Sequence, residues 1–224
     1  MDVVDLGLTA YEDALSTQLE LLNRRIKGNI PDTLIVTEHL PVVTLGRTAE
    51  NSAIDRAYFE NENIPVVMTN RGGNNTFHSP GQVILYPIMD LRGIKKDVSF
   101  YIDFLEETVA NSLRVLNVAA KRNSPRRGVW VGEKKIAFFG VAFKRWVTFH
   151  GVSVNVNNDI GPFSRMAPCG EADIKVTSVK KITGHMMNMT EIKEIFTRQF
   201  IKDLEAVSCR CDCRSFPKMT TKLC

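Results

Sequence analysis

No apolar run in this sequence of 224 residues is long enough to cross a bilayer, because polar and charged residues interrupt each hydrophobic stretch. The N-terminal stretch MDVVDLGLTAYEDA is acidic and lacks the basic region followed by an apolar one that a secretory signal needs. It also lacks the Arg- and Ser-rich character of a transit peptide. We therefore expect a cytoplasmic protein without a membrane partner.

Cysteine is scarce in the body of the chain, where Cys169 stands alone. The other cysteines, Cys209, Cys211, Cys213 and Cys224, lie in the C-terminal segment 209–224. This odd, uneven set is not a disulfide framework, which favours a reducing compartment. The histidines are scattered without metal-ligand spacing, and CRCDCR lacks a Cys-x-x-Cys pair, so we predict no metal.

Neither a strong net charge nor a phosphate-binding motif is present. The net charge of +4 would suit acidic protein partners, but it is too weak to indicate nucleic acid. No glycine-rich stretch ends in Gly-Lys-Ser/Thr, which excludes a P-loop. With 44% hydrophobic and 24% charged residues, the composition is that of an ordinary globular protein with one sizeable core.

The hydrophobic periodicity predicts helices among several strands. The first helix should have a capping box at Thr9 and Glu12, an apolar stripe through Leu15, Leu19, Leu22 and Ile26, and a stop at Gly28. Further helices are predicted over 52–63, over 97–116 and from residue 190. Strands are predicted over 33–39, 42–46, 64–70, 83–91, 128–132, 135–143 and 146–156, with 64–70 buried and 70–82 a loop.

This order of hairpins and helices predicts an α+β or mixed α/β fold with one large mixed sheet flanked by helices. We predict a single catalytic domain over residues 1–208. Residues 209–224 are predicted to form a flexible Cys-rich tail, because the segment has no periodicity.

Cys169 and Lys135 are the residues most suited to chemistry. Cys169 lies between Pro168 and Gly170, a turn that would expose the sulfur, although most lone cysteines are small buried hydrophobes. Lys135 stands at the start of an apolar strand, where burial would disfavour its ammonium; alternatively its side chain extends to water, as expected for Lys134. Together they could perform acyl transfer, but spacing alone does not bring them into contact.

The polar stretch Asn70–Gln82 is either a ligand-binding loop or a long turn. The histidines outside it have ordinary interpretations. His150 is expected to be a core or half-buried residue, His39 a turn residue and His185 a loop residue.

Four segments resemble the lipoyl(octanoyl) transferases when taken in order. They are TEHLPVVTLGR, RGGNNTFHSPGQVILYPIMDL, GVWVGEKKIAFFGVAFKRWVTFHGVSVNV and PFSRMAPCGEADIKVTS, within residues 34–178. The resemblance implies the fold of biotin and lipoate protein ligases. It also implies transfer of an octanoyl (or lipoyl) group from acyl carrier protein to a lysine of lipoyl domains in 2-oxo-acid dehydrogenase complexes, or of the glycine-cleavage carrier protein. Neither ATP nor a cofactor is implied.

The resemblance assigns roles to individual residues. Cys169 is implied as the nucleophile that forms a thioester, and Lys135 as the residue that favours its thiolate and acts as acid and base. The implied substrate-binding residues are Arg71, Gly72, Gly73, Asn74, Asn75, Thr76, Phe77, His78, Phe138, Phe139, Gly140, Gly151, Val152 and Ser153. One departure is Ser79, where the family has glycine; a serine limits positive φ, so we expect a shifted loop there.

Other functions fit the same residues. An ATP-dependent lipoate-protein ligase would share the fold but would not need Cys169. A non-catalytic module that binds acyl carriers would need neither Cys169 nor Lys135. A thiol hydrolase would pair the cysteine with His78 or His150.

Overall fold

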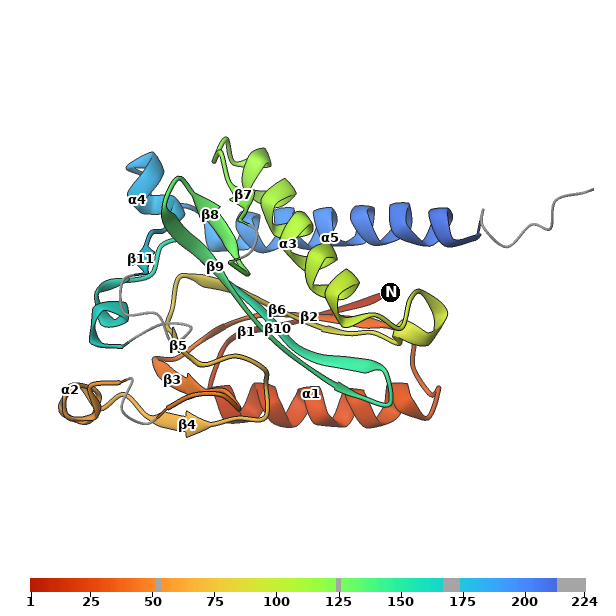
Figure 1. The fold of residues 1–224 in the computed structure, drawn as a ribbon, viewed down its shortest axis with the longest axis horizontal. Helices are drawn as coiled ribbons and strands as arrows, with labels where there is room; N and C mark the ends of the chain where they lie inside the picture. Colours follow the sequence, from red (N-terminus) through yellow and green to blue (C-terminus); the bar gives the residue numbers. More distant parts are fainter. Residues whose placement is uncertain (51–53, 124–125, 167–173, 213–224) are drawn as a thin grey trace, which may run out of the picture.

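The computed structural model describes residues 1–50, 54–123, 126–166 and 174–212, with side chains to Ser208 (Figure 1). An eight-stranded sheet forms the centre, in the order β1-β2-β6-β10-β9-β8-β7, and β11 pairs with β9. These strands are β1 (Asp2–Thr9), β2 (Thr33–His39), β6 (Gln82–Ile88), β7 (Lys121–Arg122), β8 (Val129–Val131), β9 (Lys134–Lys144), β10 (Val147–Asn155) and β11 (Lys175–Val176). Because β1 and β2 are parallel while β6, β10 and β9 are antiparallel, the sheet is mixed, as predicted.

Helices cover both faces of the central sheet (Figure 1). The helices are α1 (Tyr11–Ile26), α2 (Arg56–Asn61), α3 (Val98–Val115), α4 (Val179–Thr183) and α5 (Met189–Asp212), with 3₁₀ turns η2 (Leu91–Gly93) and η3 (Gly161–Arg165). Alternation along β2 explains the two cores: Leu34 and Val36 pack under α3 and α5, whereas Ile35 packs against α1. Phe104 of α3 meets Phe200 of α5 edge to face at 5.3 Å.

A smaller sheet lies beside the central one, with strand order β4-β3-β5. It consists of β3 (Val42–Leu45), β4 (Val66–Met68) and β5 (Asn75–His78). Phe138 of β9 stacks on Phe163 at 5.0 Å and joins the hydrophobic cluster of this sheet. The two sheets are therefore fixed against each other at β9.

Three element predictions are wrong in part. The 70–82 stretch is not all loop, since β5 inside it is a buried strand that pairs with β3. The strand predicted as buried over 64–70 is the short edge strand β4, and Met68 there is 66% exposed. Strand β1 was not predicted, because its exposed residues include the apolar Val3 and Leu8 beside Asp2 and Asp5, so it lacks a clean alternation of polar and apolar residues.

Helix α1 also differs from its predicted pattern. It begins after Ala10 without a side-chain cap, because Thr9 still belongs to β1 and pairs with His39. Its buried residues are Tyr11, Ala14, Gln18 and Leu22, whereas Leu19 of the predicted stripe is 38% exposed.

The C-terminal helix is longer than the sequence indicates. Helix α5 continues to Asp212, so the first residues of the segment 209–224 are helical and the rest lie outside the described residues. Within the described chain, no helix combines the length and the apolar character that a membrane span requires.

Candidate active site

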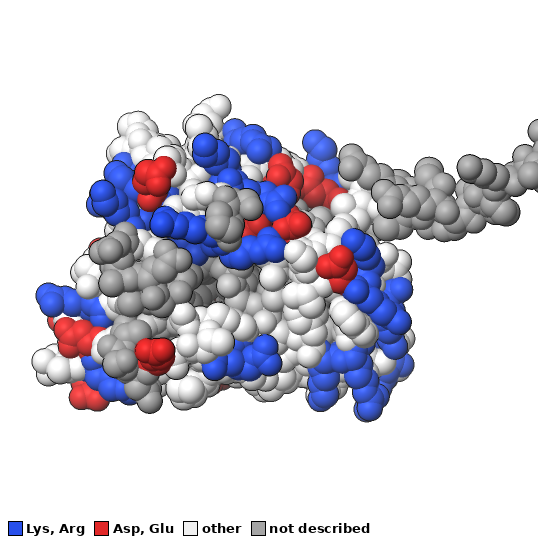
Figure 2. All heavy atoms as spheres, in the orientation of Figure 1, with Lys and Arg blue, Asp and Glu red and all other residues white. Residues whose placement is uncertain are grey.

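A cavity of about 430 Å³ lies where β9 and β10 of the central sheet meet β5 of the small sheet. Loop 71–74, β8 and the start of α1 complete its walls. Its lining includes Arg71, Arg126, Arg127 and Lys135, but no Asp or Glu of the described residues. In Figure 2, Lys and Arg side chains run above the central hollow of this face, with a few Asp and Glu among them. The cavity thus combines apolar walls with positive charge.

Lys135 is buried in the wall of this cavity and is 3% exposed. Its backbone pairs with Trp130 of β8 and Val176 of β11, and its carbonyl oxygen accepts the N–H of Thr177 at 2.9 Å. Its Nζ lies 5.4 Å from the centroid of the Trp130 ring and 5.1 Å from that of Phe138, within the range of cation–π contacts. The alternative in which Lys135 extends to water is therefore wrong, while Lys134 is exposed as predicted.

Arg71 is held rigidly at one side of the cavity. Its Nη2 donates to the carbonyl oxygen of Thr44 at 2.7 Å and to Thr44 Oγ1 at 3.0 Å, and its Nη1 donates to the carbonyl oxygen of Gly72 at 3.1 Å. Glycine is required at Gly140, because a Cβ there would lie 2.9 Å from Arg71 Cδ. The N–H of Gly72 donates to the carbonyl oxygen of Val141 at 2.9 Å, which ties the loop to β9.

A layer of neutral aromatic rings forms the floor of the cavity. His78 Nδ1 lies 3.1 Å from Gln82 Oε1, and its ring stacks on Tyr11 at 6.4 Å. Behind it, His39 Nε2 lies 2.8 Å from the hydroxyl of Tyr86. Burial holds the pKa of His78 well below its usual range and lowers the pKa of His39 to about 4. Both rings are neutral near pH 7 and act as hydrogen-bonding groups.

His150 lines the cavity from a strained position in β10. Its φ of 55° is unusual for a residue other than glycine, and its N–H donates to Gln18 Oε1 at 2.8 Å. Its Nε2 lies 2.7 Å from Asn70 Oδ1. Burial, reinforced by the positive charge of Arg71, lowers the pKa of His150 to about 4. The expectation of a buried histidine is confirmed, and the ring also faces the cavity.

Most of the predicted substrate-binding residues line this cavity. They are Arg71, Gly73, Asn74, Asn75, Thr76, His78, Phe138, Phe139, Gly140, Gly151, Val152 and Ser153. Gly72 lines a neighbouring cavity, and Phe77 points away to pack edge to face on Phe163 at 5.9 Å. Cys169 lies outside the described residues, but Ile174, where the described chain resumes, lines the cavity.

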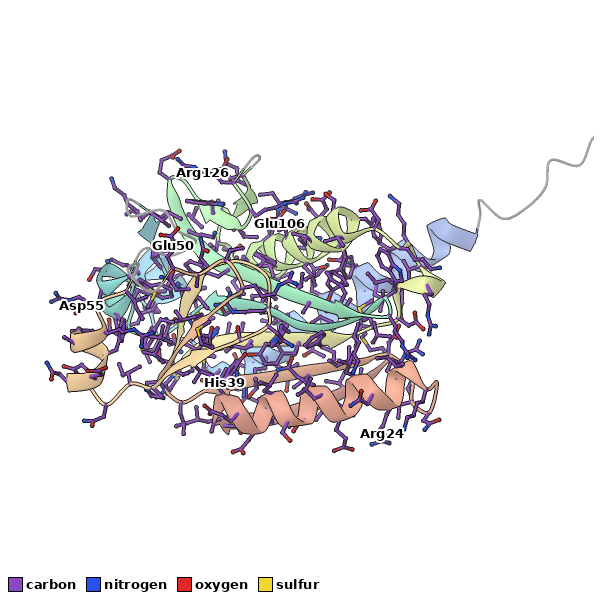
Figure 3. The ribbon with its side chains drawn as sticks, turned by 60° about the horizontal axis from the view of Figure 1, so that its bottom comes forward. Arg24, His39, Glu50, Asp55, Glu106 and Arg126 are labelled. Carbon is purple, nitrogen blue, oxygen red and sulfur yellow. The ribbon has the colours of Figure 1, made fainter. Side chains whose placement is uncertain are left out.

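Sequence reasoning missed several residues at this site. Tyr11, Tyr86 and Trp130 line the cavity but were assigned only to helix or strand. His39 is not a turn residue, because it ends β2 and is buried within the fold (Figure 3). Tyr86 and Trp130 lie within the segments that resemble the family, which was the available signal. His185 is exposed after α4, as expected for a loop.

Two further expectations concern Ser79 and metals. Ser79 is not among the residues with positive φ, so serine fits its own backbone conformation, and the loop shift relative to the family stays a prediction. No group of three or more His, Cys, Asp and Glu in the described part of the chain could hold a metal ion.

The fold is that of the catalytic domains of cofactor-attaching protein ligases. It superposes on lipoate-protein ligase A bound with ATP with a TM-score of 0.72 at 17% identity, covering 93% of this chain and 92% of that one. For the biotin protein ligase from Aquifex aeolicus in complex with biotin and ATP, the TM-score is 0.62 at 13% identity, covering 93% and 72%. These similarities confirm the predicted fold.

The lipoyl protein ligase A/B catalytic domain family matches residues 10–201, and the chain belongs to this family. An octanoyltransferase from Alkaliphilus metalliredigens (strain QYMF) is 40% identical over 216 residues, covering 92% of this chain and 99% of the relative. One from Solibacter usitatus (strain Ellin6076) is 41% identical over 199 residues, covering 88% and 90%. The predicted relationship to the octanoyltransferases is confirmed, and so is the class of enzyme, an acyltransferase.

Proposed function

We propose that this protein is an octanoyltransferase that acts in protein lipoylation. It takes an octanoyl (or lipoyl) group from acyl carrier protein and transfers it to a lysine of a lipoyl domain or of the glycine-cleavage carrier protein. The observation that carries the proposal is Lys135, a buried lysine in the wall of a cavity that has apolar surface and no carboxylate among its described lining residues. The names of the curated relatives support the same activity.

The first half-reaction moves the acyl group onto Cys169. The thiolate of Cys169 attacks the thioester carbonyl of the donor, a new thioester forms, and the bond to the donor sulfur breaks. The departing thiolate takes a proton from the ammonium of Lys135. Cys169 and Lys135 share one proton before the reaction, as thiolate and ammonium or as thiol and amine.

The second half-reaction forms the amide. The amine of the acceptor lysine attacks the thioester on Cys169, the new C–N bond forms, and the thiolate of Cys169 leaves. The attacking nitrogen loses its proton to the neutral amine of Lys135, which restores the starting state. Because the conversion of a thioester into an amide is downhill, the proposed reaction needs no ATP.

The cavity suits a medium-length acyl chain. Ile84, Phe138 and Val152 line it with apolar surface, and each buried methylene contributes roughly 0.8 kcal/mol. The neutral rings of His78 and His150 can donate hydrogen bonds without placing charge beside the chain. Arg126 and Arg127, at the cavity, have the sign of charge that complements an acidic carrier protein.

Intact-mass measurement with octanoyl acyl carrier protein tests the proposal. The wild-type protein should gain one octanoyl group without ATP and lose it when a lipoyl domain is added. Cys169→Ala should show no adduct, and Lys135→Ala should acylate far more slowly, while both remain folded. Full transfer by Cys169→Ala would refute the mechanism. Loss of the adduct to water alone would indicate a thiol hydrolase, and carrier binding without any adduct would indicate a binding module.

An ATP-dependent lipoate-protein ligase is the second candidate, because the fold matches that of a ligase bound with ATP. Such an enzyme would activate free octanoate as an acyl-adenylate. Modification of a lipoyl domain by free octanoate and ATP, undiminished in Cys169→Ala, would favour the ligase. We expect no reaction with free octanoate.

A further inference from the structure

A buried carboxylate lies next to the wall that contains Lys135. Glu106 of α3 is 3% exposed and lies on the side of the helix that faces the segment leading into β8. Its Oε1 accepts the N–H of Gly128 at 2.7 Å. Its Oε2 accepts from Arg122 Nε at 3.2 Å and from Arg127 Nη1 at 3.4 Å. Figure 3 shows Glu106 on α3 with Arg126 beyond it on the same side of the molecule.

Gly128, the residue that Glu106 holds, lies directly against the side chain of Lys135. A Cβ built on Gly128 would be 2.5 Å from Lys135 Cε and 3.1 Å from Nζ. The φ of Gly128 is +132°, a conformation that other residues rarely adopt. The ammonium of Lys135 therefore packs between the backbone of Gly128 and the rings of Trp130 and Phe138.

We propose that Glu106 is a positioning residue for Lys135. By accepting the N–H of Gly128, its carboxylate fixes the backbone against which the Lys135 side chain rests, and so fixes the ammonium in the wall of the cavity. The inference rests on the proposed role of Lys135 as acid and base. Displacement of a catalytic group by about 1 Å can cost on the order of a hundredfold in rate, so a rigid backbone contact at this point has a large effect.

Asp103 provides a matched control. It lies one turn before Glu106 on the same helix and forms ion pairs with the same two arginines, Arg122 and Arg127. Its side chain is 41% exposed, and its described hydrogen bonds do not include Gly128. A loss that came from the ion pairs alone would therefore follow substitution of Asp103 as well.

Two substitutions of Glu106 separate the effect of its side-chain length from the effect of its charge. Glu106→Asp keeps the carboxylate for the arginines but shortens the side chain, so that it no longer reaches Gly128. Glu106→Gln keeps the length of the side chain but removes the charge, and its single oxygen can accept either from the N–H of Gly128 or from the arginines. The rate of Cys169 acylation by octanoyl acyl carrier protein is measured across pH by intact mass, for both variants and for Asp103→Asn, Lys135→Ala and wild type.

We expect Glu106→Asp to acylate at least about tenfold more slowly, with a shifted pH midpoint, because the ammonium of Lys135 moves. Asp103→Asn should stay within about threefold of wild type, with an unchanged pH midpoint. Glu106→Gln should lose less than Glu106→Asp, because one of its two orientations keeps the hydrogen bond from Gly128. Urea denaturation checks that each variant is folded.

Three outcomes would overturn the inference. The first is a wild-type acylation rate and pH profile in Glu106→Asp. The second is a larger loss of acylation rate in Glu106→Gln than in Glu106→Asp. The third is the same loss of rate in both Glu106 variants and in Asp103→Asn. Lys135→Ala separates these results from failure of the proposed function. If it keeps the wild-type rate, the role of Lys135 is wrong; if it is inactive while Glu106→Asp is unaffected, only the role of Glu106 is wrong.

Discussion

At the scale of single residues, the site depends on close packing around Lys135. The apolar strand that follows it left two alternatives open, burial of its side chain or extension to water, and the structure shows burial. The contact with Gly128 could not be expected, because β8 and β9 pair with a register irregularity that no local pattern encodes. Glu106 was missed for a related reason. Within the charged stretch EET it is typical of a solvent-facing helical residue, and only the packing of α3 in the fold buries it.

Gly128→Ala should impair acylation and reduce stability. The new methyl group would lie 2.5 Å from Lys135 Cε, too close for both to stay in place, and the φ of +132° would cost roughly 1–3 kcal/mol for a residue with a side chain. We expect a large loss in the acylation rate by intact mass and a lower urea midpoint. Gly132→Ala is the control, since its φ is +56° but nothing lies within 4 Å of its Cβ. It should lose some stability and keep the rate; equal rate losses in both variants would contradict the packing argument.

The buried histidines should make the protein less stable in mild acid. The folded-state pKa values of His39 and His150, about 4, lie below the ordinary value of 6.5. The unfolded chain therefore binds more protons between these values, so the stabilisation is complete above pH 6.5 and is lost as the pH falls toward 4. Each ring contributes a slope of up to roughly 1 kcal/mol per pH unit.

Urea denaturation between pH 7.5 and pH 4.5 measures this slope. His39→Gln should reduce the slope, because it removes one of the titrating rings while glutamine keeps a polar group near Tyr86. His185→Gln is the control, since His185 is exposed. A slope unchanged by His39→Gln would show that His39 does not titrate at this low pKa.

At the scale of elements, the helices and strands predicted from hydrophobic periodicity were correct where one side of the element is apolar. The predictions failed where polar residues are buried. Helix α3 follows its predicted range and begins at its cap, Asp97, which accepts the N–H of Phe100. The predicted buried side of helix α1 was only partly right: Leu22 is buried as predicted, but Gln18, whose Oε1 accepts the N–H of His150, is fully buried and was missed. Strand β5 was read as loop because its residues Asn75, Thr76 and His78 are polar yet line the cavity. The buried polar residues of β5 thus belong to the wall of the cavity.

Gln18→Leu should destabilise the protein by roughly 1–3 kcal/mol, because the buried N–H of His150 loses its acceptor. The strained backbone at His150 depends on that acceptor, so the acylation rate should also fall. Urea denaturation and intact-mass acylation measure the two effects. Leu19→Gln is the control on the same helix; its side chain is partly exposed, and it should change stability by less than about 0.5 kcal/mol. A wild-type stability for Gln18→Leu would refute the role of Gln18.

At the scale of the whole molecule, the mixed sheet and its covering helices were predictable from the order of strands and helices. The strand order was not, because β2 pairs with β6 and β6 with β10 across long stretches of chain. The cavity depends on that order, since β10 lies between β6 and β9 and brings Val152 opposite Phe139 and Ser153 opposite Phe138. The segments that resemble the family therefore converge only in the folded chain.

Truncation tests the proposed limits of the catalytic domain. A chain ending at Asp212 should fold and acylate like the full protein, because the family match ends at residue 201 and α5 is intact. A chain ending at Asn188 should unfold, because it loses Ile192, Phe196 and Phe200, each worth roughly 1.5–3 kcal/mol of burial beneath the sheet. Thermal denaturation and intact-mass acylation of both chains measure this. An inactive but folded chain ending at Asp212 would assign a role in the reaction to residues 213–224.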